Sequence, residues 1–208
     1  MTRLEHLRER YERHHRSRSS EFVFGGDERA MLFRRLVAGP GRRVLDLGCR
    51  YGALTRAYAE GNEVVGVDVD RDALAEAAKI GIETLWADVE EPLALGDASF
   101  DVVVAGELIE HLRDPERLVA EARRVLRPGG TFAASVPNFF RLRNRLAMLV
   151  GRPLDHDPTH LHIFAPRDLE RLMTGWDELR LHFIASRLLK LSPRLFGNIV
   201  VFSARKPR

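Results

Sequence analysis

Short apolar runs alternate along the chain with longer amphipathic stretches. Five of these runs, each five or six residues long, predict strands. They lie at residues 42–47, 64–68, 82–86, 100–105 and 131–136. The run at 100–105 is apolar at nearly every position, as expected for a strand covered on both faces.

Helical patterns separate the predicted strands, at residues 53–60, at 71–79 and from Pro115 to just before Pro128. Pro115 suits the first turn of a helix, where its missing N–H costs nothing. Strand–helix alternation with short connections predicts an α/β fold. We expect a doubly wound, Rossmann-like sheet with helices on both faces.

The alternation stops after Pro137. Residues 138–165 predict a long, partly helical insertion, which is followed by a helix at 166–174 and two strand-like segments at 179–189 and 197–204. Residues 1–40 predict helix, loop and helix, so we expect an N-terminal helical cap ahead of one domain at 41–208. Within the cap, the apolar run Phe22, Val23 and Phe24 is expected to anchor it, and His14 and His15 are expected at the surface.

Composition is that of an ordinary globular protein: 208 residues, 45% hydrophobic and 30% charged. No apolar stretch approaches the roughly 18 to 20 residues that span a bilayer, so we expect no stable membrane insertion. The N-terminal residues have no apolar core of the secretory type. Cys49 is the single cysteine, which excludes an internal disulfide and favours a reducing, cytoplasmic location.

Charge is unevenly distributed. Residues 1–43 carry a net +5, residues 44–138 a net −9 and residues 139–208 a net +7, which together give the overall +3. Basic flanks around an acidic centre suit an anionic partner such as phosphate, nucleic acid or a membrane surface. Arginine-rich surfaces that only maintain solubility are the alternative.

Chemistry-bearing residues follow the predicted strands. Asp46, Gly48 and Gly52 end the first strand, where glycines let a ligand approach the backbone. Asp68 ends the second strand, where a carboxylate can accept both hydroxyls of a ribose. Asp88 follows the third strand. Because the carboxyl ends of parallel strands meet at one edge, these side chains are expected to share a site.

These residues lie in the motifs VLDLGCRYG, VVGVD, WAD, SFDVVVAGELIEHLRDP and LRPGGTF, and with them the chain resembles class I S-adenosylmethionine-dependent methyltransferases over about residues 41–205. A nicotinamide-binding domain is the main competitor, but it needs G-x-G-x-x-G directly after the first strand. The resemblance implies the strand order 3-2-1-4-5-7-6 with the last strand antiparallel. It also implies S-adenosylmethionine as cofactor, bound by Asp46, Gly48, Cys49, Gly52, Asp68, Val69, Asp88, Val89 and Glu107.

Arg50 departs from this pattern, because the family usually has glycine there. A positive φ at Arg50 would cost about 1 kcal/mol or more. We expect its side chain to point outward and leave the site open. A retired cofactor site in a methyltransferase-like regulatory protein is the alternative.

Glu107, Glu110 and His111 follow the fourth strand and share one face if the turn is helical. With a later histidine pair, this E-x-x-E-H motif resembles two metal-dependent branches of the family, the ubiquinone-biosynthesis O-methyltransferases and the small-RNA 3′-terminal 2′-O-methyltransferases. The resemblance implies a Mg²⁺ or Mn²⁺ site formed by Glu107, Glu110, His111 and His162, with His160 in reserve. Without metal, His111 and Glu107 remain the catalytic candidates, His111 as general base.

Arg141, Arg143 and Arg145 alternate with apolar residues beyond the fifth strand, in a stretch with a helical leucine stripe. We expect an amphipathic helix packed on the domain, and a basic lid over an anionic or lipid-like acceptor is the alternative.

The sequence thus predicts an S-adenosylmethionine-dependent O-methyltransferase for a small hydroxylated acceptor such as a sugar, catechol or prenylated phenol. The alternatives are RNA terminal ribose 2′-O-methylation and a catalytically silent regulator. Oligomeric state is left open.

Overall fold

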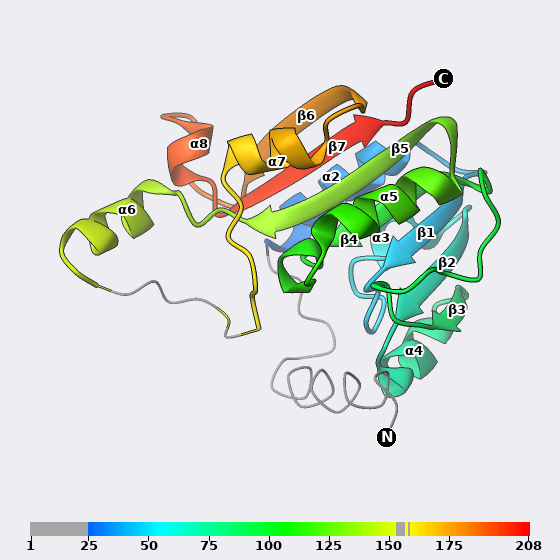
Figure 1. The fold of residues 1–208 in the computed structure, drawn as a ribbon. Helices are drawn as coiled ribbons and strands as arrows, with labels where there is room; N and C mark the ends of the chain where they lie inside the picture. The colour runs from blue at the N-terminus through cyan, green and yellow to red at the C-terminus, as the bar shows by residue number, and fades with distance from the viewer. Residues whose placement is uncertain (1–24, 153–156, 158) are drawn as a thin grey trace.

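The computed structural model describes residues 25–152, 157 and 159–208. Within these residues, seven strands form one sheet in the order β3-β2-β1-β4-β5-β7-β6 (Figure 1). The strands are β1 (Arg43–Leu47), β2 (Glu63–Asp68), β3 (Glu83–Trp86), β4 (Phe100–Gly106), β5 (Leu126–Pro137), β6 (Asp177–Ile184) and β7 (Ile199–Arg205). β7 pairs antiparallel with both β5 and β6, while β1 to β5 pair in parallel. The predicted fold class and strand order are confirmed.

Helices cover both faces of this sheet, as predicted. The helices on one face are α2 (Gly26–Val37), α3 (Arg56–Ala59) and α4 (Arg71–Ala78), and those on the other are α5 (Pro115–Val125) and α7 (Pro166–Leu172) (Figure 1). Successive strand residues point to opposite faces. Val104 of β4 therefore packs in the cluster with α2, while Val103 packs in the cluster with α5. Three short elements complete the fold, η1 (Ile109–His111), α6 (Leu142–Leu149) and α8 (Pro193–Phe196).

Several predicted elements differ in length from those observed. The helix expected at 53–60 is confined to Arg56–Ala59, and Thr55 makes no cap hydrogen bond because its hydroxyl donates to Asp46. The fifth strand begins at Leu126 rather than 131, because a register shift opposite Phe100 accommodates the Pro-Gly-Gly turn within the strand.

The strand expected at 179–189 begins at Asp177 and ends at Ile184. Ala185 has φ 65°, which breaks the extended conformation, and its N–H donates to the Glu28 carboxylate at 2.8 Å instead of to a strand. The chain therefore turns away from the sheet after β6.

The amphipathic helix expected after the fifth strand forms as α6, but it does not pack on the domain. None of its side chains is buried, and Leu149 is 81% exposed. The expectation of a packed helix is therefore wrong. The leucine stripe is present, yet Leu146 and Leu149 remain exposed.

Of the expected N-terminal cap, the described part is α2, which buries Phe33 and Val37 against the sheet. His14, His15 and the run at 22–24 lie outside the described residues. Among the helices that are described, none is long and apolar enough to cross a membrane.

Candidate active site

The carboxyl ends of β1, β2 and β4 meet at one edge of the sheet and carry the predicted site residues (Figure 1). Asp46 lies near the end of β1, Asp68 is the last residue of β2, and Glu107 directly follows β4. This edge is where ligands bind in open parallel sheets.

Asp46 is a buried carboxyl group with two hydroxyl donors. Its Oδ2 accepts hydrogen bonds from Thr55 Oγ1 at 2.5 Å and from Tyr58 OH at 2.7 Å, and the residue is 3% exposed. Burial raises the pKa of Asp46 to about 6, and the nearby Asp68 adds to the rise, while the two hydroxyls and Arg29 oppose it. This carboxyl group therefore titrates close to neutral pH.

The glycine-rich loop after β1 is tied to β2. The N–H groups of Gly48 and Cys49 both donate to the Val67 carbonyl, at 2.8 and 3.2 Å. Gly48 has φ 71°, and a Cβ there would lie 3.1 Å from Leu108. Cys49 packs in the core, and burial raises the pKa of its thiol well above the ordinary value. The loop backbone, rather than the Cys49 side chain, is thus the part placed to meet a ligand.

Arg50 adopts φ 49°, the left-handed conformation that its place in the loop requires. Its N–H donates to Asp68 Oδ2 at 2.9 Å. The expectation that its side chain points outward is not met, because Nε and Nη2 are buried and the guanidinium lies 5.6 Å from the Tyr51 ring centroid. The Arg50 side chain is therefore folded back onto the protein beside Tyr51.

Asp68 and Asp88 are both buried at this edge, 5% exposed each. Asp68 Oδ1 accepts the Asp70 N–H at 2.9 Å, and Asp88 Oδ1 accepts the Glu90 N–H at the same distance. Val69 is half-buried beside Asp68, whereas the Val89 side chain packs in the core. Both carboxylates are held by backbone donors in fixed positions.

Glu107 has φ 56° and turns the chain sharply after β4. Its N–H donates to the Ser135 carbonyl at 3.0 Å, and its Oε1 accepts from Ser135 Oγ at 2.9 Å. Glu107 is therefore braced against β5 by one serine.

His111 is positioned by hydrogen bonds to Thr159, which in turn is bonded to Asp157, both near the end of the insertion that follows β5. Thr159 Oγ1 donates to Asp157 Oδ1 at 2.6 Å, and His111 Nδ1 lies 3.0 Å from the same hydroxyl and 3.2 Å from the Thr159 carbonyl. Because the threonine proton is given to Asp157, Nδ1 of a neutral His111 must be the donor. The basic lone pair of the ring is then on Nε2.

Glu110 is a buried carboxyl group, 1% exposed, and neither of its oxygens accepts a hydrogen bond from a described residue. Burial raises its pKa well above the ordinary value, and the charges of Glu107 and Asp157 act in the same direction. His160 Nε2 lies 4.0 Å from Oε1. Ligand atoms of Glu110, His111 and His160 all lie within 4.8 Å of one another.

This grouping differs from the predicted metal ligands. Within the described residues, the candidate cluster contains neither Glu107 nor His162. His162 stacks on Phe164 with ring centroids 5.7 Å apart, while His160, the reserve candidate, lies 4.7 Å from the His111 ring. In an extended segment, residues two apart point to the same face, so the sequence could not choose between the two histidines.

Arg29 is the site residue that the sequence analysis missed. It is 4% exposed on α2, and a Cβ on Gly106 would come within 2.5 Å of its Nη2, so the guanidinium lies against the end of β4. Its charge lowers the pKa values of both Asp46 and Glu110 against the effect of burial. Arg29, Phe33 and Val37 are spaced four residues apart, and this buried stripe was the available signal.

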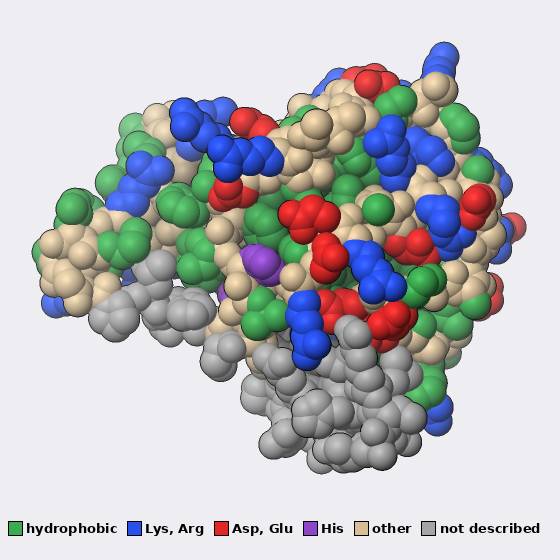
Figure 2. All heavy atoms as spheres, viewed as in Figure 1, with side chains coloured by type: hydrophobic (Ala, Val, Ile, Leu, Met, Phe, Trp, Pro, Cys, Tyr) green, Lys and Arg blue, Asp and Glu red, His purple; other side chains and the backbone are tan. Residues whose placement is uncertain are grey.

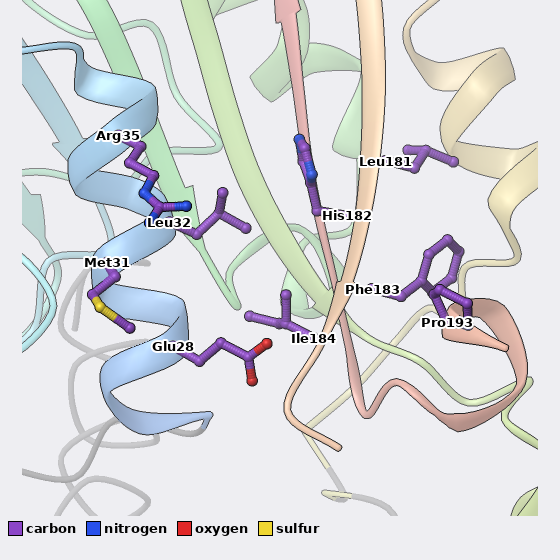
Figure 3. A pocket seen from close by; sticks show the side chains of 9 residues that line it. All are labelled: Glu28, Met31, Leu32, Arg35, Leu181, His182, Phe183, Ile184 and Pro193. Carbon is purple, nitrogen blue, oxygen red and sulfur yellow. The ribbon is translucent and has the colours of Figure 1, made fainter. Parts of the chain in front are cut away.

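A separate groove of about 390 Å³ lies between α2 and the edge strand β6 and contains none of the predicted site residues (Figure 3). It is lined by Glu28, Met31, Leu32, Arg35, Leu181, His182, Phe183, Ile184 and Pro193.

Comparison with known proteins agrees with this geometry. Residues 45–134, from β1 into β5, match the family described as "Methyltransferase domain". The relatives that this chain matches include proteins named as probable S-adenosylmethionine-dependent methyltransferases. The predicted family resemblance is thereby confirmed.

Relatives of the methyltransferase domain include the ubiquinone biosynthesis O-methyltransferase of Hahella chejuensis, 40% identical over 119 residues, which are 54% of this chain and 47% of that protein. The chain spans about half the length of the curated relatives it matches first.

Solved structures share the fold of the methyltransferase domain. The structure of an S-adenosylmethionine-dependent methyltransferase of Archaeoglobus fulgidus aligns with a TM-score of 0.70 at 22% identity. The alignment covers 86% of this chain and 92% of the Archaeoglobus chain. A phosphoethanolamine N-methyltransferase of Haemonchus contortus, in complex with S-adenosyl-L-methionine, has a TM-score of 0.67 at 19% identity, covering 88% of this chain and 53% of that one.

Proposed function

We propose that this protein is an S-adenosylmethionine-dependent O-methyltransferase acting on a small hydroxylated acceptor, such as a sugar, catechol or prenylated phenol. The observation that carries the proposal is the chain Asp157–Thr159–His111, which presents a basic imidazole nitrogen beside the edge that carries Asp46 and Asp68. A positioned base is what transfer to a hydroxyl oxygen needs, because the hydroxyl must lose its proton as it is methylated.

The described residues fit the cofactor. Asp46, with Gly48, Gly52 and Cys49 in the loop, would hold the methionine end, and Arg29 offers a cation to its carboxylate. Asp68 would accept the ribose hydroxyls, and Asp88 with Val69 and Val89 would border the adenine. Glu107 would line the same site. Bound S-adenosylmethionine supplies an electrophilic methyl group.

In this mechanism, His111 Nε2 is the base that takes the proton from the hydroxyl group of the substrate. Thr159 and Asp157 keep Nδ1 as the donor nitrogen, and the Asp157 charge favours the imidazolium that forms. His111 would end the reaction protonated, because it would take the proton that the acceptor hydroxyl loses as the oxygen receives the methyl group. Glu107, which accepts a hydrogen bond from Ser135, would orient the acceptor.

A divalent cation is the alternative occupant of the same place, because His111 Nε2 would then bind the metal and could not also take the proton. The Glu110 carboxylate, buried without a hydrogen bond from any described residue, and the two imidazoles of His111 and His160 form a mixed oxygen and nitrogen donor set. Imidazole donors suit Mn²⁺ better than Mg²⁺, which prefers oxygen ligands. A bound cation would lower the pKa of a coordinated acceptor hydroxyl.

The test measures methyl transfer from S-adenosylmethionine to a panel of catechols, prenylated phenols, sugars and RNA 3′-termini, each with Mn²⁺, Mg²⁺ or chelator. We expect a hydroxylated small molecule to be methylated, and His111→Ala to lower kcat by about 10²- to 10⁴-fold with S-adenosylhomocysteine binding retained. His162→Ala is the matched control.

Transfer to RNA alone would replace the proposed acceptor class by terminal ribose. Tight cofactor binding without any transfer would instead favour the regulatory alternative. Absence of S-adenosylhomocysteine binding by calorimetry would overturn the cofactor assignment, and Arg50→Gly then shows whether the Arg50 side chain is the obstruction.

A further inference from the structure

Two segments far apart in the sequence come together beyond the end of β5. Residues 139–152 contain α6, and residues 185–197 contain α8, which contacts α6. Asn138 Nδ2 donates to the carbonyls of Arg194 at 3.0 Å and Gly197 at 2.9 Å. The Arg141 guanidinium also donates to Asn198. Figure 1 shows α6 and α8 at the same side of the molecule, projecting beyond the sheet.

These two segments expose large apolar side chains. Leu149 is 81% exposed, Leu191 73% and Val150 70%. The other exposed apolar side chains on the two segments are Leu146, Met148 and Leu188. Leu146, Leu149 and Val150 are spaced i, i+3 and i+4, so they share one helix face. Nothing in the described part of the chain covers this face.

The same segments are basic and contain no acidic residue. Their cations are Arg141, Arg143, Arg145, Arg152, Arg187, Lys190 and Arg194. No carboxylate of a described residue forms an ion pair with any of them, although cations elsewhere, such as Arg124 and Arg127, are paired. Figure 2 shows hydrophobic and basic side chains intermingled over α6. We call these seven cations and six apolar side chains the basic–apolar surface.

We propose that the basic–apolar surface docks this protein reversibly on a membrane that contains anionic lipid. Leucine, valine and methionine side chains would enter the boundary between headgroups and acyl chains, while the arginines and Lys190 meet lipid phosphates. An anionic membrane is the partner whose charge is opposite to that of the seven cations on this surface. A second copy of the chain would bring the same seven cations face to face.

Nucleic acid satisfies the cations but not the apolar side chains. Binding to single strands uses exposed aromatic rings for base stacking, and the phenylalanines of these segments, Phe139, Phe140 and Phe196, are buried or half-buried. The exposed side chains are aliphatic instead, and aliphatic side chains gain most by leaving water for a lipid environment.

The basic–apolar surface adjoins the candidate active site, so a docked membrane would lie close to that site. Phe139, at the start of the surface segment, packs its ring 5.7 Å from the His160 ring, and His160 in turn lies against His111. The docking proposal does not depend on methyl transfer, and its test needs neither cofactor nor acceptor.

The test is sedimentation of the full chain with vesicles of phosphatidylcholine alone or phosphatidylcholine with phosphatidylglycerol. We expect binding only to the anionic vesicles and weaker binding as salt increases. Leu149→Glu should weaken binding at least about tenfold because it removes an apolar side chain that would enter the lipid. The double variant Arg143→Ser with Lys190→Ser should weaken binding by a similar factor because it removes two cations. All these side chains are exposed, so thermal unfolding should be unchanged.

Matched controls carry the same changes elsewhere on the surface. Met31→Glu places a charge at an exposed apolar position on α2, and Arg34→Ser with Arg56→Ser removes two exposed cations. Both control proteins should bind anionic vesicles as the unmodified chain does. Equal binding to both vesicle types, no binding to either, or full binding by Leu149→Glu would overturn the proposal. So would dimers in sedimentation velocity that Leu149→Glu dissociates, or RNA binding that Leu149→Glu abolishes.

Discussion

At the scale of single residues, Asp46 makes stability depend on pH in an unusual direction. Its folded pKa of about 6 lies above that of an unfolded aspartate, so the folded state holds a proton that the unfolded state releases. The resulting stability is fully present below about pH 4 and is lost as pH rises through about 6. Relative to Asp46→Asn, the unmodified protein should lose roughly 3 kcal/mol of unfolding free energy across this window.

Urea unfolding of both proteins without ligand, at several pH values, measures this difference. The asparagine amide introduces a constant offset, because its NH₂ group is buried, but no titration in this range. A difference that stays flat with pH would show that Asp46 ionises in the folded protein as it does in water.

The choice between His160 and His162 is also a question of single residues. If Glu110, His111 and His160 hold Mn²⁺, added Mn²⁺ should raise Tm by several degrees, because a ligand that binds only the folded state stabilises it. Glu110→Gln and His160→Ala should abolish this shift, and His162→Ala should retain it. Calorimetric scanning with and without Mn²⁺ provides the measurement, and loss of the shift in His162→Ala alone would restore the ligand set predicted from the sequence.

At the scale of elements, β2 passes close to the glycine-rich loop at Gly66. A Cβ there would lie 2.7 Å from Cys49 Sγ and 3.0 Å from Ile82 Cδ1. Gly66→Ala should therefore cost about 1 to 3 kcal/mol of unfolding free energy through overpacking. Cys49→Ala in the same chain should recover part of that loss, as a double-mutant cycle would show.

Gly96→Ala is the matched substitution, because its Cβ would meet nothing nearer than Ser99 at 3.9 Å. It should change the unfolding free energy by no more than about 0.5 kcal/mol. Equal effects of the two substitutions would mean that β2 does not approach the loop closely.

At the scale of the whole molecule, cofactor binding should stabilise the packing of α2 on the sheet through Arg29, whose guanidinium lies against the end of β4. S-adenosylhomocysteine at about 100 times its Kd should add about 2.7 kcal/mol of stability and raise Tm by roughly 5 to 10 °C. Arg29→Ala should remove most of this shift, since its guanidinium lies at the end of β4 beside the cofactor edge. Arg34→Ala, an exposed cation on the same helix, should leave the shift intact. A full shift in Arg29→Ala would exclude a role for Arg29 in cofactor binding.

The alternation of apolar runs and amphipathic stretches was enough to predict the sheet, its strand order through the family resemblance, and the edge that gathers Asp46, Asp68 and Asp88. These features are local. A period of two or 3.6 residues decides which side chains can be buried, and strand ends place the residues that follow them. Pro115 marked the start of α5 correctly for the same reason.

Other features depend on segments that meet only in the folded chain. His160 rather than His162 joins Glu110, Arg29 reaches β4 from α2, and α6 keeps its leucines exposed although its pattern matches that of a packed helix. Each depends on the distance and angle between elements that lie tens of residues apart, because an apolar stripe becomes buried only where another element lies over it. Periodicity therefore predicted the layers and the edge of the candidate site, and long-range packing decided which side chains lie together there.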